Sequence, residues 1–421
     1  MQGSTIQLVA ATLFGLALLH TFSVKLFERF AARHPQHAGL FHLLGEVEVV
    51  FGFWAIVLIV AMALLVGGTE ALDYAESRNY AEPLFVFVVM VVAASRPVLR
   101  TVVASVAGIA RFAPLPTPIA TAWLGLAAVP LLGSLVTEPA AMTIAALMLA
   151  PQIFRPAVPE PAKYLALGVL FVNVSIGGTL TSYAAPPVLM VASTWQWDSA
   201  FMFTHFGWKA ALAVIVNASV ATLVLRQTLM TRDDAAEETP LNDAPVPFGV
   251  VAVHLVLLAA IVAFAHHPVA FLGLFLMFLG FSQAYERHQA PLILKEALLV
   301  GFFLAGLVVL GGMQQWWLQP IVGGLEPLSL FFGALGLTAI TDNAALTYLG
   351  SLIAGISAES KYMLVAGAVA GGGLTVIANA PNPAGVALLK RGFSDETVST
   401  VGLLLGAAGP TAVAAAAFLL L

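Results

Sequence analysis

Two short segments place an acidic residue among hydroxyl-bearing residues in the middle of long apolar stretches. Residues 133–143 (GSLVTEPAAMT) contain Glu138, and residues 337–347 (LTAITDNAALT) contain Asp342. Both segments share the pattern Thr-acid-x-Ala-Ala-x-Thr. Placing a carboxylate at bilayer depth costs about 2.5–3.5 kcal/mol even on lenient insertion scales, and acids kept there usually mark ion or proton sites. The pattern therefore predicts two equivalent acidic sites.

Each acidic segment is followed by a Lys-Tyr pair and then by a glycine-rich break inside an apolar stretch. The pairs are Lys163-Tyr164 and Lys361-Tyr362, and the breaks are 177–187 (GGTLTSYAAPP) and 371–383 (GGGLTVIANAPNP). Broken helices free backbone carbonyls and direct half-helix dipoles toward a shared cavity. The same order of features in both halves indicates an internal repeat that brings the breaks beside the acids.

The side chains of these segments form a set of oxygen ligands. Carboxylate, hydroxyl and amide oxygens suit Na⁺ or a similar small cation rather than a soft metal. Because burial disfavours a charged carboxyl group, each acid can hold a proton or a cation but not easily both, which is the minimum requirement for exchange. An alternative is that the acids only cap the helices that follow them. The predicted cation and proton site consists of Thr137, Glu138, Thr181, Ser182, Thr341, Asp342, Asn343, Thr375 and Asn379.

The composition indicates what kind of scaffold must position these residues. The chain has 421 residues, of which 60% are hydrophobic and 9% are charged, and it contains no cysteine. A soluble domain carries about 25% charged residues, so a cytosolic enzyme, a disordered protein and a nucleic-acid binder are excluded. The absence of cysteine excludes disulfides and thiol chemistry. The fold class expected is an all-α polytopic membrane protein, with no cofactor and with membrane lipids as its surroundings.

Hydrophobic segments of roughly 20 residues predict about ten transmembrane helices. They lie near 4–24, 41–66, 82–104, 162–196, 204–225, 248–266, 268–285, 294–313, 361–389 and 398–419. The first is interpreted as a span rather than as a cleaved signal, because it lacks a basic start and a cleavage site. Two further stretches, 117–153 and 327–357, are too long for one crossing and too short for two, so we interpret them as re-entrant hairpins.

The basic residues predict the orientation of these spans. If both termini are outside, 14 of the 17 Lys and Arg residues fall on the inner side, which is a strong positive-inside bias. Five crossings per half then give two repeats of inverted topology. The predicted organisation is an N-terminal repeat at 1–228, a cytoplasmic linker at 229–247 and an inverted C-terminal repeat at 248–421, in a bacterial inner membrane.

Other polar residues within the spans rank below the two acids. Glu46 and Glu48 are interpreted as an interfacial carboxylate pair, although a role in proton access stays open. Lys209 could neutralise a buried acid or extend its ammonium group to the membrane surface.

The hairpin tips and the breaks resemble those of the ion transporter superfamily, and most of all its bacterial putative Na⁺/H⁺ antiporters. The resemblance covers essentially the whole chain. Carboxylate carriers of that superfamily have Ser-Asn-Thr at the tips, whereas this chain has Thr137-Glu138-Pro139 and Thr341-Asp342-Asn343. An acid at each tip would repel a carboxylate, which favours a cation as cargo. The resemblance also implies a homodimer with a scaffold and a moving transport unit.

Three other functions are weighed against an antiporter. A Na⁺-coupled carrier of a small organic or inorganic anion would need a basic or Ser/Asn-rich pocket, and Lys209 is the only basic candidate within the spans. An intramembrane enzyme is disfavoured because the sequence has no His-Glu-x-x-His, Gly-x-Gly-Asp or Gly-x-Ser-x-Gly motif. A channel is disfavoured because hairpin sites suit alternating access.

Overall fold

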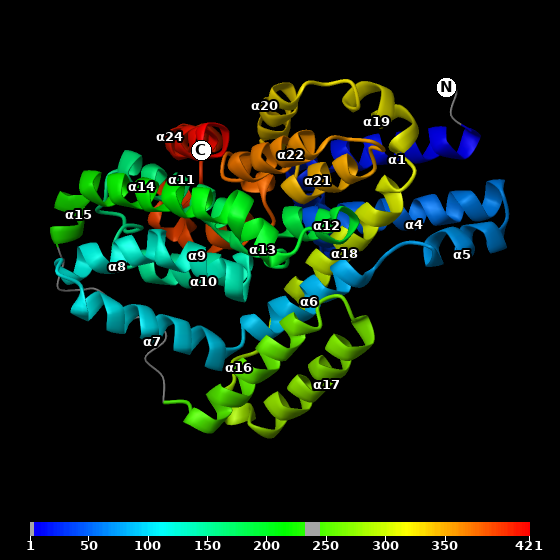
Figure 1. Ribbon diagram of the computed structural model, residues 1–421. Coiled ribbons are helices and arrows are strands. Elements are labelled where there is room, and N and C mark those ends of the chain that lie inside the picture. Colours follow the sequence, from blue (N-terminus) through cyan, green and yellow to red (C-terminus); the bar gives the residue numbers. More distant parts are fainter. Residues whose placement is uncertain (1–3, 232–244) are drawn as a thin grey trace.

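The computed structural model describes residues 4–231 and 245–421, and all regular elements in these two ranges are helices (Figure 1). Most of the predicted linker, residues 232–244, lies outside the described part of the chain. The all-helical prediction is confirmed for the rest.

The first half of the chain forms fifteen α-helices, with short 3₁₀ or π turns between some of them. They are α1 (Thr5–Thr21), α2 (Val24–Arg33), α3 (Ala38–Gly45), α4 (Val47–Leu65), α5 (Gly68–Glu76), α6 (Ala81–Ala93), α7 (Arg96–Phe112), α8 (Thr117–Leu126), α9 (Ala128–Val136), α10 (Glu138–Leu149), α11 (Glu160–Gly177), α12 (Pro186–Trp195), α13 (Ser199–Met202), α14 (Trp208–Val224) and α15 (Arg226–Met230).

The second half is also divided into short and long helices. They are α16 (Phe248–Ala263), α17 (Pro268–Ala284), α18 (Leu294–Gly311), α19 (Gln315–Val322), α20 (Pro327–Thr338), α21 (Asn343–Ser351), α22 (Ala358–Gly371), α23 (Asn382–Leu389) and α24 (Thr400–Leu420). The two breaks predicted from Gly and Pro are present, because α11 and α12 are separated at 178–185 and α22 and α23 at 372–381.

The break between α6 and α7 was not predicted. The expected crossing at 82–104 is divided into α6 and α7, which meet at an angle of 64°. Pro97 lies in the first turn of α7. Proline is favoured there, and it cannot donate the backbone hydrogen bond that would continue a preceding helix. The chain therefore ends one helix and begins another at this point.

The two stretches predicted as hairpins are each divided into separate helices at the acidic segment. In the first, the chain turns at Thr137, and α10 packs back against both α8 and α9. In the second, α20 ends at Thr338, α21 begins after Asp342, and both helices pack against α22. This arrangement holds both acids at turns between helices.

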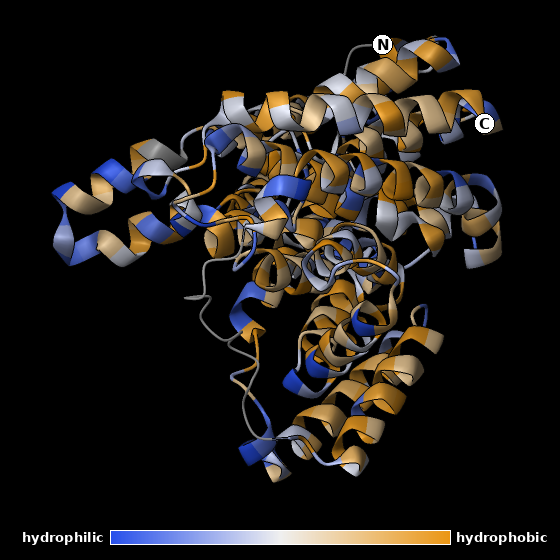
Figure 2. Ribbon diagram, turned by 90° about the vertical axis from the view of Figure 1, so that its left-hand side faces the viewer, coloured by the Kyte–Doolittle hydropathy of each residue, from blue (hydrophilic) through white to orange (hydrophobic). Residues whose placement is uncertain are grey.

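The apolar surface of the molecule fits a bilayer. Within the described residues, five helices are long and apolar enough to cross a membrane, or up to eight spans if each bent pair counts as one. Helices α16 and α17 are apolar but have only 16 and 17 residues. Hydrophobic residues make up most of the helices (Figure 2), and large apolar side chains such as Phe112 are exposed on the bare protein. We conclude that this is an integral membrane protein.

Helix α24 is packed between helices from both halves of the chain. Tyr164, near the start of α11, accepts a hydrogen bond from the backbone N–H of Ser399 at 2.9 Å, directly before α24 begins. Tyr362, near the start of α22, donates to the backbone oxygen of Phe418 at 2.8 Å, in the last turn of α24. Helices α11 and α22 therefore begin at opposite ends of α24.

The carboxyl ends of α11 and α22 meet between these two points. The Ser175 hydroxyl, in the last turn of α11, donates to the backbone oxygen of Val369 in α22 at 2.8 Å. With their starts at opposite ends of α24 and their ends in contact, the two helices run in opposite directions. The two glycine-rich breaks consequently lie side by side in the protein interior.

Candidate ion-binding site

Glu138 is completely buried and is the first residue of α10. Its Oε2 atom accepts a hydrogen bond from Nδ2 of Asn379 at 2.8 Å. Its Oε1 atom has no hydrogen-bond partner within the described structure. A Cβ atom on Gly178 would lie only 2.6 Å from this Oε1 atom, so the first break passes directly against the carboxyl group. Glu138 is thus held between the break of its own half and the break of the other half.

The second break is stabilised by Asn382, the first residue of α23. Its Nδ2 group donates to the backbone oxygens of Gly372 at 2.8 Å and of Thr375 at 2.9 Å. This amide closes the loop that carries Asn379. The Oδ1 atoms of Asn379 and Asn382 are both buried and have no partner among the described residues. The Asn382 nitrogen therefore fixes the backbone, the Asn379 nitrogen binds Glu138, and both amides leave their oxygens available.

Corresponding threonines attach each break to its hairpin. The Thr181 hydroxyl donates to the backbone oxygen of Ser134 at 2.7 Å, and the Thr375 hydroxyl donates to that of Ala339 at 2.9 Å. Both acceptors lie at the end of the first hairpin helix. The acidic turn and the break of each half therefore form one connected structure.

Glycines allow this attachment to be close. A Cβ atom added to Gly177 would lie 2.6 Å from the backbone oxygen of Pro130. A Cβ atom added to Gly371 would lie 2.5 Å from the backbone oxygen of Leu335. Any larger residue at either position would push the break away from its hairpin.

Asp342 lies at the amino end of α21 and is partly exposed. Its Oδ1 atom accepts from the backbone N–H groups of Ala344 at 2.8 Å and Ala345 at 3.2 Å. Asp342 therefore caps α21, as the alternative interpretation of the acids predicted. Only its Oδ1 atom takes part in the cap, and its Oδ2 atom does not. The capping interpretation does not apply to Glu138, which makes no such bond and is preceded by Thr137 with φ of 102°.

The remaining predicted residues divide into two groups. Thr137 and Asn343 are buried near the turns, each with an unpaired oxygen, and Asn343 Nδ2 donates to the Ser175 hydroxyl at 3.4 Å. Thr341 precedes Asp342 and is partly exposed. Ser182 is different, because its N–H and its hydroxyl both contact the Ser199 hydroxyl at 3.2 Å. The structure therefore places Ser182 beside the neighbouring helix α13 rather than with the other predicted site residues.

Sequence reasoning missed several residues of this region. Ser134 donates to the backbone oxygen of Gly177 and accepts from the N–H of Leu180. Thr338, which is equivalent to Ser134 in the repeat, has a buried hydroxyl oxygen without a partner in the described structure. Asn382 was also overlooked, although it lies in the second break. The repeat alignment contained a signal for the first two, since both positions carry a hydroxyl.

The unpaired oxygens are the main chemical feature of the site. We use the name oxygen cluster for six buried oxygens of the two acidic segments and the second break that have no partner among the described residues: Oγ1 of Thr137, Oε1 of Glu138, Oγ1 of Thr338, Oδ1 of Asn343, Oδ1 of Asn379 and Oδ1 of Asn382. Buried polar side-chain atoms in proteins usually have hydrogen-bond partners, so a group of them without partners needs an explanation. Every member is an oxygen, and oxygen is the ligand preferred by small hard cations.

The electrostatic surroundings of the site are acidic. The carboxyl groups of Glu138 and Asp342 interact electrostatically, and Asp342 also interacts with Glu48 at the start of α4. The Oε1 atom of Glu46 lies 3.4 Å from Nζ of Lys295, so Glu46 forms an ion pair with this residue. Carboxyl groups that interact with one another favour the binding of a cation or a proton over that of an anion.

Lys209 does not neutralise either acid. Its Nζ donates to the Tyr362 hydroxyl at 2.8 Å and lies 4.6 Å from the centre of the Tyr362 ring. Its ammonium group is therefore engaged near the amino end of α22, close to the end of α24.

Comparison with known proteins identifies a family for the chain. A family model described as "Putative Na+/H+ antiporter" matches residues 5–421. The solved structure of the YdaH transporter of Alcanivorax borkumensis is 16% identical in sequence and has a TM-score of 0.45. That similarity covers 88% of this chain and 96% of the transporter chain. No curated protein matches the sequence.

Proposed function

This chain belongs to the putative Na⁺/H⁺ antiporter family, and from that premise we propose that it exchanges Na⁺, or another small monovalent cation, for H⁺ by alternating access. The observation that carries the proposal is the completely buried Glu138, whose free Oε1 atom belongs to the oxygen cluster. A cation bound there would gain ligands for its charge and would satisfy oxygens that otherwise lack partners.

The exchange step follows from the chemistry of a buried carboxyl group. Burial penalises the charged form unless a positive charge accompanies it. Glu138 therefore has two acceptable states, protonated or paired with a cation, and switching between them moves one proton against one cation. Asp342 supplies a second carboxyl group that is close enough to interact with the first.

The proposed architecture is about ten crossings with two re-entrant hairpins in inverted repeats. The opposite directions of α11 and α22, and the similar attachments of Thr181 and Thr375, support this arrangement. In such repeats the two hairpins enter from opposite sides, which provides a site that can open to one side at a time.

A Na⁺-coupled anion carrier is the alternative, and the site offers it less support. Its basic candidate, Lys209, is bonded to Tyr362, and the residues around Glu138 provide two interacting carboxyl groups. An anion would be repelled by both of them unless cations were bound first.

The test uses purified protein in proteoliposomes that contain a pH-sensitive dye. Na⁺, Li⁺, K⁺ or Ca²⁺ is added to one side of the membrane in separate experiments. The dye should report proton movement only for those ions that the protein transports. We expect Asp342→Asn and Glu138→Gln to abolish this signal while the proteins insert and purify normally. Glu76→Gln, at the exposed carboxyl end of α5, is the matched control and should keep it. Normal exchange by well-folded Asp342→Asn and Glu138→Gln proteins would refute the assignment.

A further inference from the structure

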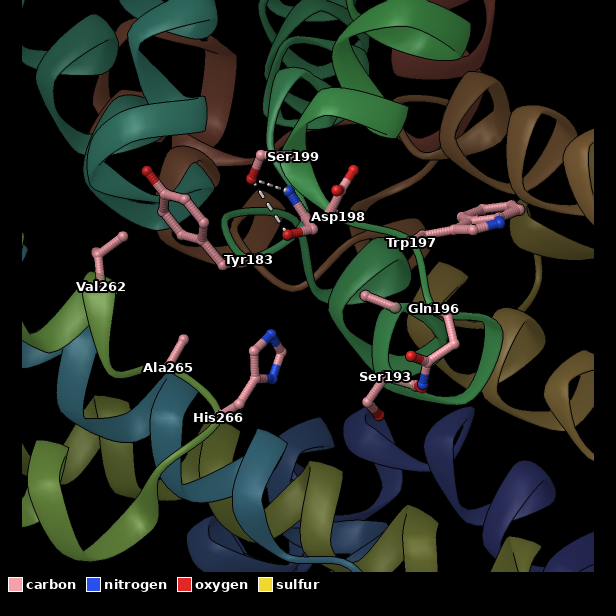
Figure 3. Close-up of a pocket in the computed structure, with 11 residues that line it drawn as sticks. Tyr183, Ser193, Gln196, Trp197, Asp198, Ser199, Val262, Ala265 and His266 are labelled. Carbon is pink, nitrogen blue, oxygen red and sulfur yellow. Dashed lines mark hydrogen bonds between the residues drawn. The ribbon is translucent and has the colours of Figure 1, made fainter.

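A cavity of about 670 Å³ lies next to the first break (Figure 3). One wall is the segment that contains Ser182 and Tyr183, and the opposite wall is the connection between α16 and α17, with Ala265 and His266. The end of α12 and the start of α13 close it with Gln196 and Ser199. At roughly 30 Å³ per water molecule in the liquid, the cavity could hold on the order of twenty waters.

The inner end of the cavity is formed by the break itself. Ser182 is 7% exposed, and its N–H and hydroxyl groups meet the Ser199 hydroxyl. The preceding residue, Thr181, is bonded to the hairpin at Ser134, and Gly178 of the same segment lies against the carboxyl group of Glu138. Three residues of chain, 179–181, therefore separate the wall of the cavity from the contact with the buried acid.

The outer end of the cavity is polar and reaches the surface. Gln196, Asp198 and His266 line it and are exposed. Asp198 and His266 are the titratable groups at this end, and the Tyr183 hydroxyl is a third in the wall; no Lys or Arg is among the described lining residues. The Asp198 carboxylate accepts the backbone N–H of Phe201 at 2.7 Å, which fixes its position. A hydrated cation at this mouth meets one fixed negative charge.

We propose that this cavity is the aqueous vestibule through which a hydrated monovalent cation reaches the break at 177–187, with Asp198 raising the local cation concentration at its mouth. The proposal rests on the proposed function, because it concerns the path to the same site. A cation keeps its hydration shell only where water accompanies it, so a path lined by Ser182, Ser199 and Gln196 avoids the large cost of an apolar route. A fixed carboxylate attracts cations over about one Debye length, roughly 10 Å at 0.1 M salt.

Thiol labelling tests the path, because the chain contains no cysteine of its own. Ser199→Cys and Gln196→Cys should react with a cationic, membrane-impermeant methanethiosulfonate reagent, and the reaction should stop cation-driven proton movement. Thr204→Cys is the matched control, because Thr204 is exposed on the same segment, outside the cavity, and bonds only within its own helical turn. It should be labelled without loss of exchange.

The outcomes separate the vestibule from the proposed function. Labelling at both cavity positions without any loss of exchange, or no labelling at either, would overturn the vestibule while leaving the antiporter intact. If the cysteine-free protein itself moved no protons in response to cations, the proposed function would fail instead. Protection of Ser199→Cys from labelling by Na⁺, but not by choline, would then still report whether cations enter the cavity.

The charge at the mouth is tested by Asp198→Asn. Asn caps a helix about as well as Asp, so this change removes the charge while keeping the bond to Phe201. We expect the Na⁺ concentration for half-maximal exchange to rise about 2–5-fold at low ionic strength and to return toward the unsubstituted value at high ionic strength, with the maximal rate unchanged. An unchanged half-maximal concentration at low ionic strength would overturn the role assigned to Asp198.

Discussion

The amide of Asn379 donates a hydrogen bond of 2.8 Å to the carboxylate of Glu138, although 241 positions separate the two residues. Glu138 belongs to the hairpin of the first half, and Asn379 belongs to the break of the second. The bond joins the two halves of the chain at a buried acid. Any change in how the halves pack must therefore act on this carboxyl group directly.

Asn379→Ala should destabilise the protein and weaken cation binding. Loss of the amide leaves Oε2 of Glu138 buried without a donor, which costs about 1–3 kcal/mol. The midpoint of thermal unfolding in detergent should fall, and the Na⁺ concentration for half-maximal exchange should rise. Asn79→Ala is a suitable control, since Asn79 bonds to Glu82 outside the site. Equal effects of the two substitutions on Na⁺ dependence would argue against a ligand role for Asn379.

Gly178→Ala should disturb the carboxyl group of Glu138 without removing it. The added Cβ would lie 2.6 Å from Oε1, so the carboxylate or the break must move. A displacement that costs about 1.4 kcal/mol of binding energy lowers cation affinity roughly tenfold. Isothermal titration with Na⁺ measures this effect. Gly108→Ala in α7 is the matched control, because nothing lies within 4 Å of the position of its Cβ, and it should bind Na⁺ normally.

Much of this arrangement could be predicted from the sequence, because the same motifs occur in the same order in both halves of the chain. The two acids, the two breaks and the Thr181 and Thr375 positions all came from matching order in the two halves. The partner of Glu138 could not be predicted. A hydrogen bond between residues 241 positions apart depends on how the halves pack, and nothing in the local pattern of Asn379 indicates it. The bend between α6 and α7 was missed because residues 82–104 have the length and overall hydrophobicity of a single span, although Arg96 and Pro97 were usable signals.

The proposed orientation predicts the reactivity of single cysteines. Thr231→Cys, at the start of the predicted linker, should be labelled only from the cytoplasm, and Glu76→Cys, after the first part of the loop at 67–82, only from outside. Both positions are exposed in the described structure. Labelling of intact cells and of inverted vesicles with an impermeant maleimide measures this directly. The reverse labelling pattern would mean that each hairpin enters from the side opposite to the one proposed. Labelling of both cysteines from the same side would rule out an odd number of crossings between them, and with it the five-crossing repeat.

Cation affinity should increase with pH if the same oxygens bind protons and cations. At low pH the proton occupies the carboxyl group of Glu138 or Asp342, so a cation must displace it and binding must release it. By linkage, the apparent affinity then falls by up to roughly tenfold for each unit of pH below the range in which the free site loses its proton, and it becomes constant above that range. Calorimetric titration of purified protein with Na⁺, in two buffers of different ionisation enthalpy, measures affinity and proton release together.

An anion carrier with coupled sodium would show Na⁺ affinity that strengthens with its substrate and changes little across neutral pH. Binding of Na⁺ that releases no proton and does not vary between mildly acidic and alkaline conditions would exclude the exchange mechanism, since no shared site would then exist.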